Sequence, residues 1–94
     1  MKSIRGAIAV VENNEESIMS SSKKLINEIL INNAITENDI EFVIFTVTSD
    51  ITEAFPAKAF RELGMTSIAA IDTRAPNIQS DLSGCIRILI YLHK

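Results

Sequence analysis

The clearest pattern in the sequence is a series of apolar, β-branched segments separated by polar stretches. Residues 4–11, 40–47 and 85–93 are three such segments and predict strands, and the shorter segment 67–71 predicts a fourth. The segment 40–47 is almost continuously apolar, which predicts a central strand covered on both faces. In the last segment, isoleucines at alternate positions predict one apolar face, and Arg87 falls on the other face.

Two further segments have helical character. Residues 15–32 repeat apolar side chains at helical spacing after an Asn-Asn-Glu-Glu sequence, which is typical of a helix start. A shorter helix is predicted from Pro56 to Gly64, because proline fits a first turn and glycine fits the residue after a helix. Residues 36–39 resemble a capping box and predict one helical turn. Residues 72–83 are rich in turn formers and predict a loop.

The order of these elements predicts the fold class. The long connection through the helix at 15–32 favours parallel, right-handed pairing of the first two strands. The expected architecture is α/β (α+β), with a mixed β-sheet and helices packed on one of its faces. With 94 residues, the chain has room for a single domain spanning 1–94.

Composition and charge exclude several classes of protein. With 47% apolar residues and a positive mean hydropathy, the chain is globular, and no apolar run approaches the length of a membrane span. The net charge of −3 provides no field that attracts nucleic acid or an acidic membrane, so an anionic ligand needs a local cluster of cations. The single cysteine, Cys85, and an N-terminal segment unlike a signal peptide predict a cytoplasmic protein. The high apolar fraction for so small a domain also hints at oligomerisation.

The candidate chemistry lies in a small set of cations, because the sequence contains neither a glycine-rich phosphate loop nor a cluster of metal ligands. Arg87 interrupts an apolar strand; such an arginine is usually an edge residue or the partner of a carboxylate, and less often binds a ligand. Lys58 and Arg61 are three residues apart and share one helix face, which is more often solvated than an anion site. Arg5 and Arg74 complete the set, and spacing alone favours a solvated Arg5 at the rim of the sheet.

Three segments resemble the monofunctional chorismate mutases of the trimeric, barrel-like α/β type. They are SIRGA at 3–7, FTVTSDITEAFPAKAFRELG at 45–64 and CIR at 85–87. The resemblance covers nearly the whole chain, and FPAKAFREL at 55–63 is its most specific part. It implies a trimeric pseudo-α/β-barrel, a homotrimer with its active sites between subunits.

The resemblance also implies an enzyme that rearranges chorismate to prephenate in aromatic amino-acid biosynthesis. This unimolecular Claisen step needs no cofactor and no metal. The enzyme must hold a small dicarboxylate in a compact conformer and stabilise negative charge on the breaking ether oxygen, and arginine suits both tasks. By resemblance, the catalytic residues would be Arg87 at the ether oxygen and Arg5 at a substrate carboxylate. The residues implied to shape the neighbouring substrate-binding wall are Phe55, Ala57, Lys58 and Arg61.

Two departures from the family pattern leave alternatives open. The family has a Cys-x-x-Glu segment before its loop, and an ungapped count back from CIR places Asp72 at that cysteine and Ala75 at that glutamate. Asp72 is either a substrate-binding substitute for the missing carboxylate or a residue that ends a strand in a turn. The sequence ends at Lys94, whereas the family continues with a strand and a tail that supply a tyrosine and an arginine. The alternatives to an active chorismate mutase are a non-catalytic homologue that binds a small dicarboxylate and a structural trimer with a vestigial pocket.

Overall fold

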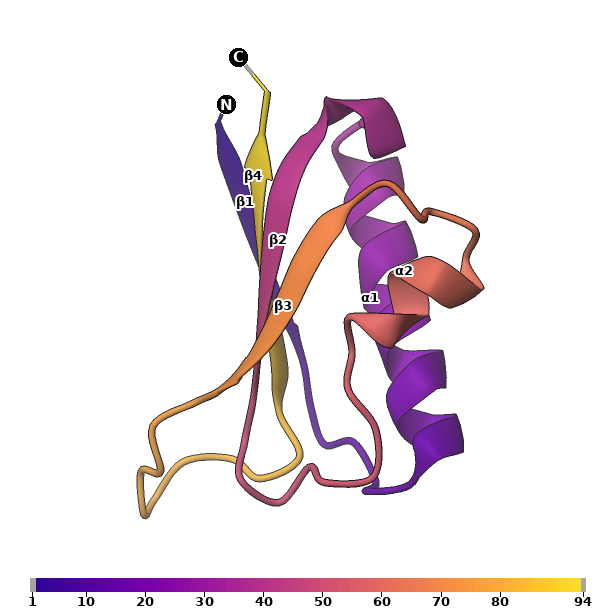
Figure 1. The fold of residues 1–94 in the computed structure, drawn as a ribbon. Coiled ribbons are helices and arrows are strands. Elements are labelled where there is room, and N and C mark those ends of the chain that lie inside the picture. The colour runs from indigo at the N-terminus through magenta and orange to yellow at the C-terminus, as the bar shows by residue number, and fades with distance from the viewer. Residues whose placement is uncertain (1, 94) are drawn as a thin grey trace.

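The computed structural model describes residues 2–93 and shows, in that range, a four-stranded sheet with two α-helices on one of its faces (Figure 1). Met1 and Lys94, the first and last residues of the sequence, lie outside the described residues. The predicted mixed α/β architecture is thereby confirmed. In chain order the elements are β1 (Ser3–Ile8), α1 (Glu15–Asn32), a short 3-10 helix (Glu37–Asp39), β2 (Ile40–Val47), α2 (Lys58–Glu62), β3 (Ala69–Arg74) and β4 (Ile86–Leu92).

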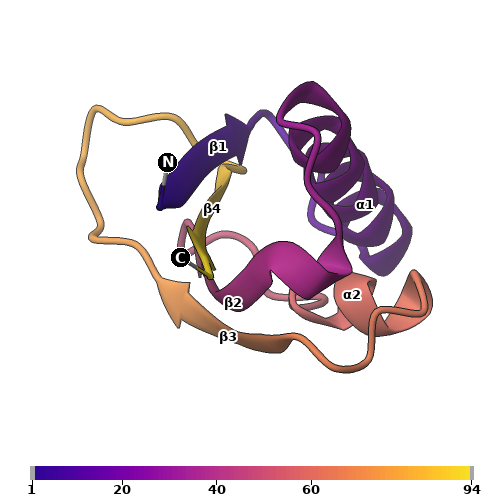
Figure 2. The ribbon, with the colours of Figure 1, turned by 90° about the horizontal axis from the view of Figure 1, so that it is seen from above.

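The strands are arranged in the order β1-β4-β2-β3, with β4 antiparallel to both of its neighbours and β2 parallel to β3. Seen from above, the strands follow one another around a curve, with α1 and α2 on one side (Figure 2). The expectation that the first two strands pair directly is wrong, because β4 lies between β1 and β2. The physical reason is burial: β4 has isoleucine at three alternate positions, and the central place covers these side chains almost completely.

Two element starts are fixed by the capping residues that the sequence indicated. The side chain of Asn14 accepts a hydrogen bond from the Ser17 backbone N–H at 2.7 Å, so α1 begins at Glu15. At the predicted turn, the Thr36 N–H donates to the Asp39 carboxylate at 2.8 Å and completes a capping box. Both predictions are confirmed.

Other boundaries differ from the predicted ones. β1 ends at Ile8 rather than residue 11, and the chain then turns so that the Val11 N–H donates to the Gly84 carbonyl at 2.8 Å. β3 continues to Arg74, in register with Val47 of β2, so the first residues of the predicted loop belong to a strand. α2 is shorter than predicted, and β4 is one residue shorter at each end.

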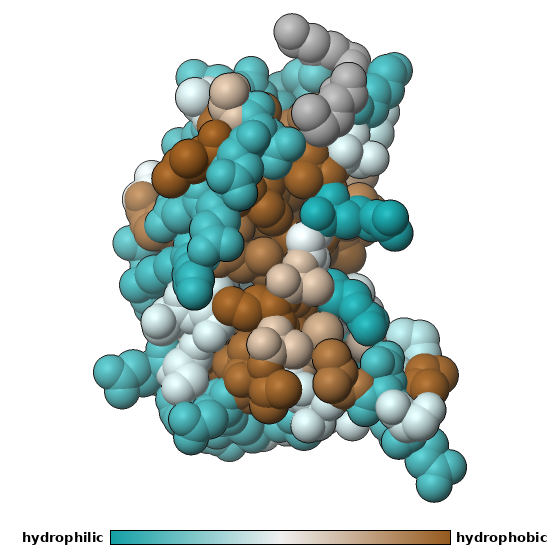
Figure 3. All heavy atoms as spheres, turned by 180° about the vertical axis from the view of Figure 1, so that it is seen from behind, coloured by the Kyte–Doolittle hydropathy of each residue, from teal (hydrophilic) through white to brown (hydrophobic). Residues whose placement is uncertain are grey.

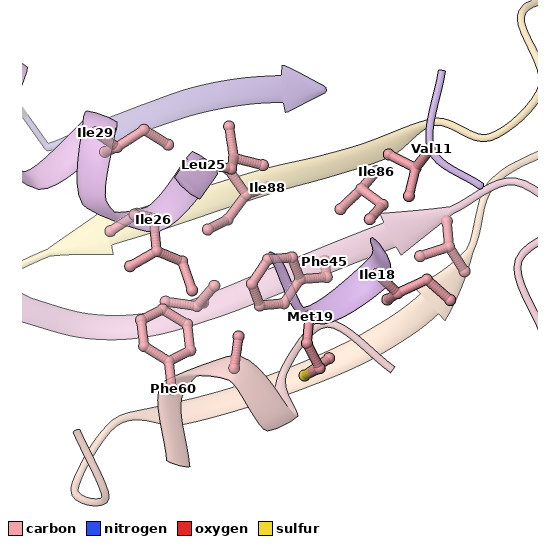
Figure 4. Close-up of a cluster of buried hydrophobic side chains, with 14 of the residues drawn as sticks. Val11, Ile18, Met19, Leu25, Ile26, Ile29, Phe45, Phe60, Ile86 and Ile88 are labelled. Atoms are coloured by element: carbon pink, nitrogen blue, oxygen red, sulfur yellow. The ribbon is translucent and has the colours of Figure 1, made fainter. Parts of the chain in front are cut away.

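The hydrophobic core lies between the sheet and the two helices (Figure 4). Phe45 of β2 packs against Phe60 of α2 with 5.9 Å between the ring centroids, and both rings are almost fully buried. This contact ties α2 to the middle of the sheet and so positions the segment around Phe55. The largest fully buried side chains also include Ile18, Ile26, Val43, Ile86 and Ile90.

The opposite face of the sheet, here called the open face, is covered by neither α-helix in the described part of the chain, and the loop after β3 borders it through Ala75 and Pro76. It presents Phe42, Ile71, Leu89 and Tyr91, whose side chains are 36–61% exposed. Seen from behind, where β1 and α1 are nearest the viewer, the molecule also has hydrophobic atoms at its surface among hydrophilic ones (Figure 3). The prediction that 40–47 is covered on both faces is therefore wrong for a single chain. The side chains of the open face are Ser3, Arg5, Ala7, Phe42, Ile44, Thr46, Ala69, Ile71, Thr73, Arg87, Leu89 and Tyr91.

Candidate active site

Two of the predicted site residues, Arg5 and Arg87, are neighbours on the open face. In the β1/β4 ladder Arg5 lies opposite Leu89, and Arg87 lies opposite Ala7, so the two arginines are diagonal neighbours on adjacent strands. Both side chains are exposed and line one hollow. We call these two residues the arginine pair.

The hollow beside the arginine pair suits a small anion. Among residues 2–93, no aspartate or glutamate lines it, and its walls include the apolar side chains of Ile44 and Leu89. A guanidinium group attracts an anion more strongly where apolar neighbours displace water. The arrangement can therefore hold a ligand that carries more than one carboxylate.

Thr46 also lines this hollow, and sequence reasoning missed it. Thr46 lies opposite Arg87 in the β2/β4 ladder, and its hydroxyl is buried without a hydrogen-bond partner among residues 2–93. A buried hydroxyl without a partner is costly, and a bound ligand is one way to satisfy it. No signal in the sequence distinguishes this threonine from the apolar run in which it stands.

The other predicted site residues lie around α2 and β3, and we call them the second wall. Phe55, Lys58 and Asp72 line one hollow, and an adjoining hollow is lined by Phe55, Ala57, Arg61 and Asp72. The backbone N–H of Ala57 donates a hydrogen bond to the Asp72 carboxylate at 3.0 Å. Through this bond β3 holds the start of α2, so the second wall is built as one unit.

Asp72 belongs to the second wall and not to the arginine pair. In the β2/β3 ladder it lies opposite the buried Phe45, so its side chain is on the helix-covered face, where it is half-buried. Burial raises the pKa of the Asp72 carboxyl group, and the hydrogen bond from Ala57 partly opposes this effect. Within one chain, Asp72 therefore does not place a carboxylate beside Arg87.

The two cations of α2 have different surroundings. The Nζ of Lys58 lies 2.6 Å from a carboxylate oxygen of Glu15 and 3.8 Å from one of Glu62. The hydrogen bond that Lys58 donates to Glu15, more than the charge of Glu15 itself, raises the pKa of the lysine. Arg61 makes no ion pair with any residue in the described range 2–93. A ligand can therefore bind Arg61 directly, whereas Lys58 must first give up its contact with Glu15 before it binds a ligand.

The arginine pair and the second wall do not form one pocket within a single chain. The pair lies on β1 and β4, whereas the second wall lies at the β3 edge, with β2 between them. Arg74 borders the hollows on both sides, and its Nη1 donates to the Ser49 carbonyl at 3.0 Å. Arg74 was among the candidate cations of the sequence, but the family resemblance gave it no role in the site.

Neither a metal site nor a membrane-spanning helix is evident in residues 2–93. Residues 2–93 contain no group of three histidine, cysteine, aspartate or glutamate side chains placed to hold a metal ion. In the same range, the helices are too short or too polar to span a bilayer.

Comparison with known proteins assigns the family. The family model described as chorismate mutase type I matches residues 1–94. The chain is 38% identical over 90 residues to the chorismate mutase AroH of Thermus thermophilus. The aligned segment covers 95% of this chain and 74% of that relative. The chain is also 31% identical over 91 residues to the chorismate mutase AroH of Bacillus subtilis (strain 168). This aligned segment covers 96% of this chain and 72% of the relative.

A solved structure gives the same assignment. A chorismate mutase from Clostridium thermocellum superposes with a TM-score of 0.95 at 36% identity, over 100% of this chain and 84% of that one. None of these matches supports the alternative of a non-catalytic binding protein. The chain belongs to the type I chorismate mutase family, as its resemblance to that family predicted.

Proposed function

We propose that this protein is an isomerase of aromatic amino-acid biosynthesis that rearranges chorismate to prephenate. In this step the carbon–oxygen bond of the ether breaks while a carbon–carbon bond forms within the same substrate molecule. No electron, group or proton is exchanged with a second reactant. We therefore propose that the reaction needs no cofactor and no metal.

The arginine pair is the observation that carries this proposal. Arg5 and Arg87 project from adjacent strands into a largely apolar hollow, and the two guanidinium groups match one carboxylate and the ether oxygen of the substrate. Arg87 would stabilise the negative charge that grows on the ether oxygen, while Arg5 holds a carboxylate in place. Both interactions gain strength where Ile44 and Leu89 exclude water.

We further propose that the site is completed between copies of the chain in a homotrimer. Two observations support this arrangement: the second wall is separated from the arginine pair within one chain, and the open face leaves large apolar side chains exposed. The second wall of one copy would close the hollow beside the arginine pair of another. Its proposed substrate-binding residues are Phe55, Ala57, Lys58, Arg61 and Asp72.

We also propose that the protein acts in the cytoplasm and binds neither nucleic acid nor a membrane. The net charge of −3 supports this, because it provides no general attraction for polyanions. Cys85 is buried and unpaired, which is consistent with a reducing compartment.

The proposal is tested by following the loss of chorismate absorbance with purified protein. We expect saturable turnover by the wild type and a decrease in kcat of about 10²–10³-fold in Arg87→Ala, because one charge-stabilising group is lost. Lys24→Ala removes an exposed cation from α1 and serves as the control with unchanged turnover. A wild-type protein that binds chorismate and does not convert it would overturn the proposal.

A further inference from the structure

A carboxylate lies beside Arg87 that neither the sequence pattern nor the comparisons assign to the site. Asp81, in the loop between β3 and β4, places its Oδ2 3.4 Å from Nη2 of Arg87. Figure 2 shows this loop on the side of the sheet away from α1, which is the side of the open face. Within residues 2–93 this is the one ion pair that the arginine pair makes, since Arg5 has none.

The loop orients the Asp81 side chain toward Arg87. The second carboxylate oxygen, Oδ1, accepts a hydrogen bond from the Leu82 backbone N–H at 2.8 Å. The backbone N–H of Asp81 itself donates to the Ile78 carbonyl at 3.1 Å. With Oδ1 occupied, Oδ2 is the oxygen left to face the guanidinium.

Both ends of this loop are attached to the rest of the fold. At its start, the Ala75 N–H donates to the Val47 carbonyl at 2.9 Å. At its end, the Gly84 N–H donates to the Asp50 carboxylate at 2.9 Å, and the Gly84 carbonyl accepts from Val11. The two ends of the loop that carries Asp81 are therefore held against residues 47–50 and against Val11.

The contact between Asp81 and Arg87 has little value for the stability of the fold. The two side chains are 43% and 46% exposed, and exposed ion pairs contribute only about 0–1 kcal/mol. The contact matters more for the conformation of the Arg87 side chain, because a long side chain on an open surface otherwise samples many rotamers. Ala75, which also lines the hollow, has no charged group that could hold the guanidinium.

We propose that Asp81 is a positioning residue for Arg87 and, through it, for the ether oxygen of the substrate. The contact involves Nη2 of Arg87, so the remaining N–H groups of the guanidinium stay available to the substrate. Asp81 thereby fixes one edge of the planar group and aims the rest into the hollow. This inference rests on the proposed chorismate mutase activity.

The test is the substitution Asp81→Asn in the full chain. The Oδ1 of the asparagine can still accept from Leu82, so the loop keeps its anchor, while the charge opposite Arg87 is lost. We expect kcat to fall about 10–10²-fold with little change in KM, because a displaced catalytic group affects the transition state more than the ground state. The melting temperature should not change, and Asp81→Glu should retain more activity than Asp81→Asn.

The control is Glu28→Gln, which removes an exposed carboxylate from α1 and should leave both constants unchanged. A lower KM with an unchanged kcat in Asp81→Asn would identify Asp81 as a competitor of the substrate and overturn the inference. Unchanged kcat and KM would also overturn it. A wild type without chorismate turnover is a different result, because it removes the proposed function and this inference together.

Discussion

The helix-covered face and the open face of the sheet are built from alternate residues of the same strands, yet their side chains have different surroundings. In β4, Ile86, Ile88 and Ile90 are at most 2% exposed, whereas Arg87 and Leu89 between them are exposed. The covered face thus stabilises the chain through apolar burial, at about 1.5–3 kcal/mol for each large side chain. The open face contributes less to the stability of the chain. It carries the candidate catalytic groups and the exposed apolar side chains that the proposed trimer would bury.

This difference predicts that substitutions on the two faces separate stability from activity. The open face also carries two arginines whose charge contributes little to the stability of the fold. Arg5 has no carboxylate partner among residues 2–93, and Arg87 has an exposed one. Groups kept for a ligand rather than for folding are commonly found in such surroundings.

The largest effect is expected from Phe45→Ala on the covered face. Phe45 is fully buried and packs against Phe60, so its loss leaves a cavity and should lower the free energy of unfolding by about 3–5 kcal/mol. The matched variant is Phe42→Ala, three residues away on the open face, where the residue is 38% exposed and its ring stacks on Tyr91. Urea unfolding of both variants measures the difference. Equal losses at low protein concentration would contradict the contrast between the faces.

The next prediction concerns assembly through the open face. Ile71 is 61% exposed on β3, and Ile71→Asp should keep the fold while preventing copies from packing on this face. We expect a folded monomer by circular dichroism and sedimentation, and turnover lower by at least about 10²-fold, because the substrate is no longer held from both sides. Ile31→Asp on α1, where the side chain is 77% exposed, is the control and should change neither property. A fully active monomer would show that the two walls need not come from different copies.

Local sequence signals predicted the elements well where neighbours along the chain decide the outcome. The helix at Glu15–Asn32 and the strand at Ile40–Val47 have the predicted bounds, because the Asn14 cap and the apolar run act over a few residues. The strand order was not predictable in this way. It depends on which strand buries the most apolar surface between the others, and that competition involves segments far apart in the sequence.

The candidate site shows the same division. The family resemblance predicted the arginine pair and the second wall. All of these residues except Asp72 stand in contiguous motifs, and Asp72 was placed by an ungapped count back from the CIR segment. The sequence did not indicate Thr46 or the proposed role of Asp81, for different reasons. Thr46 stands in an apolar strand, and Asp81 stands in a loop whose path depends on contacts with distant residues such as Asp50 and Val11. A family motif identifies residues by their spacing in the sequence, whereas a contact made by a loop can be identified only in the folded structure.

A smaller effect, with opposite signs on stability and activity, is expected at Asp72. Burial raises the pKa of this carboxyl group in the folded state above the ordinary value of about 3.9, so its ionised form destabilises the fold at neutral pH. Asp72→Asn keeps an acceptor for the Ala57 N–H and should raise the free energy of unfolding at pH 7. This advantage should shrink as the pH falls through the folded pKa and vanish below about pH 4. Unfolding curves at several pH values measure it, and an advantage that grows on acidification would contradict the assignment.

The Asp72→Asn variant also tests the proposed substrate-binding role of the second wall. If the Asp72 carboxylate contacts the substrate, turnover must fall in the same variant whose stability rises. A trade-off of this kind is expected of a group retained for function. A variant with higher stability and unchanged turnover would leave Asp72 as a residue that only holds the start of α2.

The smallest effects compare two hydroxyl groups that have no partner among residues 2–93, one on each side of the sheet. Ser22 of α1 is fully buried in the core, and Ser22→Ala should stabilise the fold by about 1 kcal/mol without affecting turnover, because an unsatisfied polar group is removed. Thr46→Val has nearly the same shape as the original residue and should be similarly stabilising, but it should raise KM or lower kcat, since Thr46 lines the hollow beside Arg87. Thermal unfolding and chorismate turnover of the two variants, measured side by side, separate a hydroxyl that is only buried from one that awaits a ligand. If both variants keep full activity, the Thr46 hydroxyl has no part in binding, and the arginines alone define the ligand side of the open face.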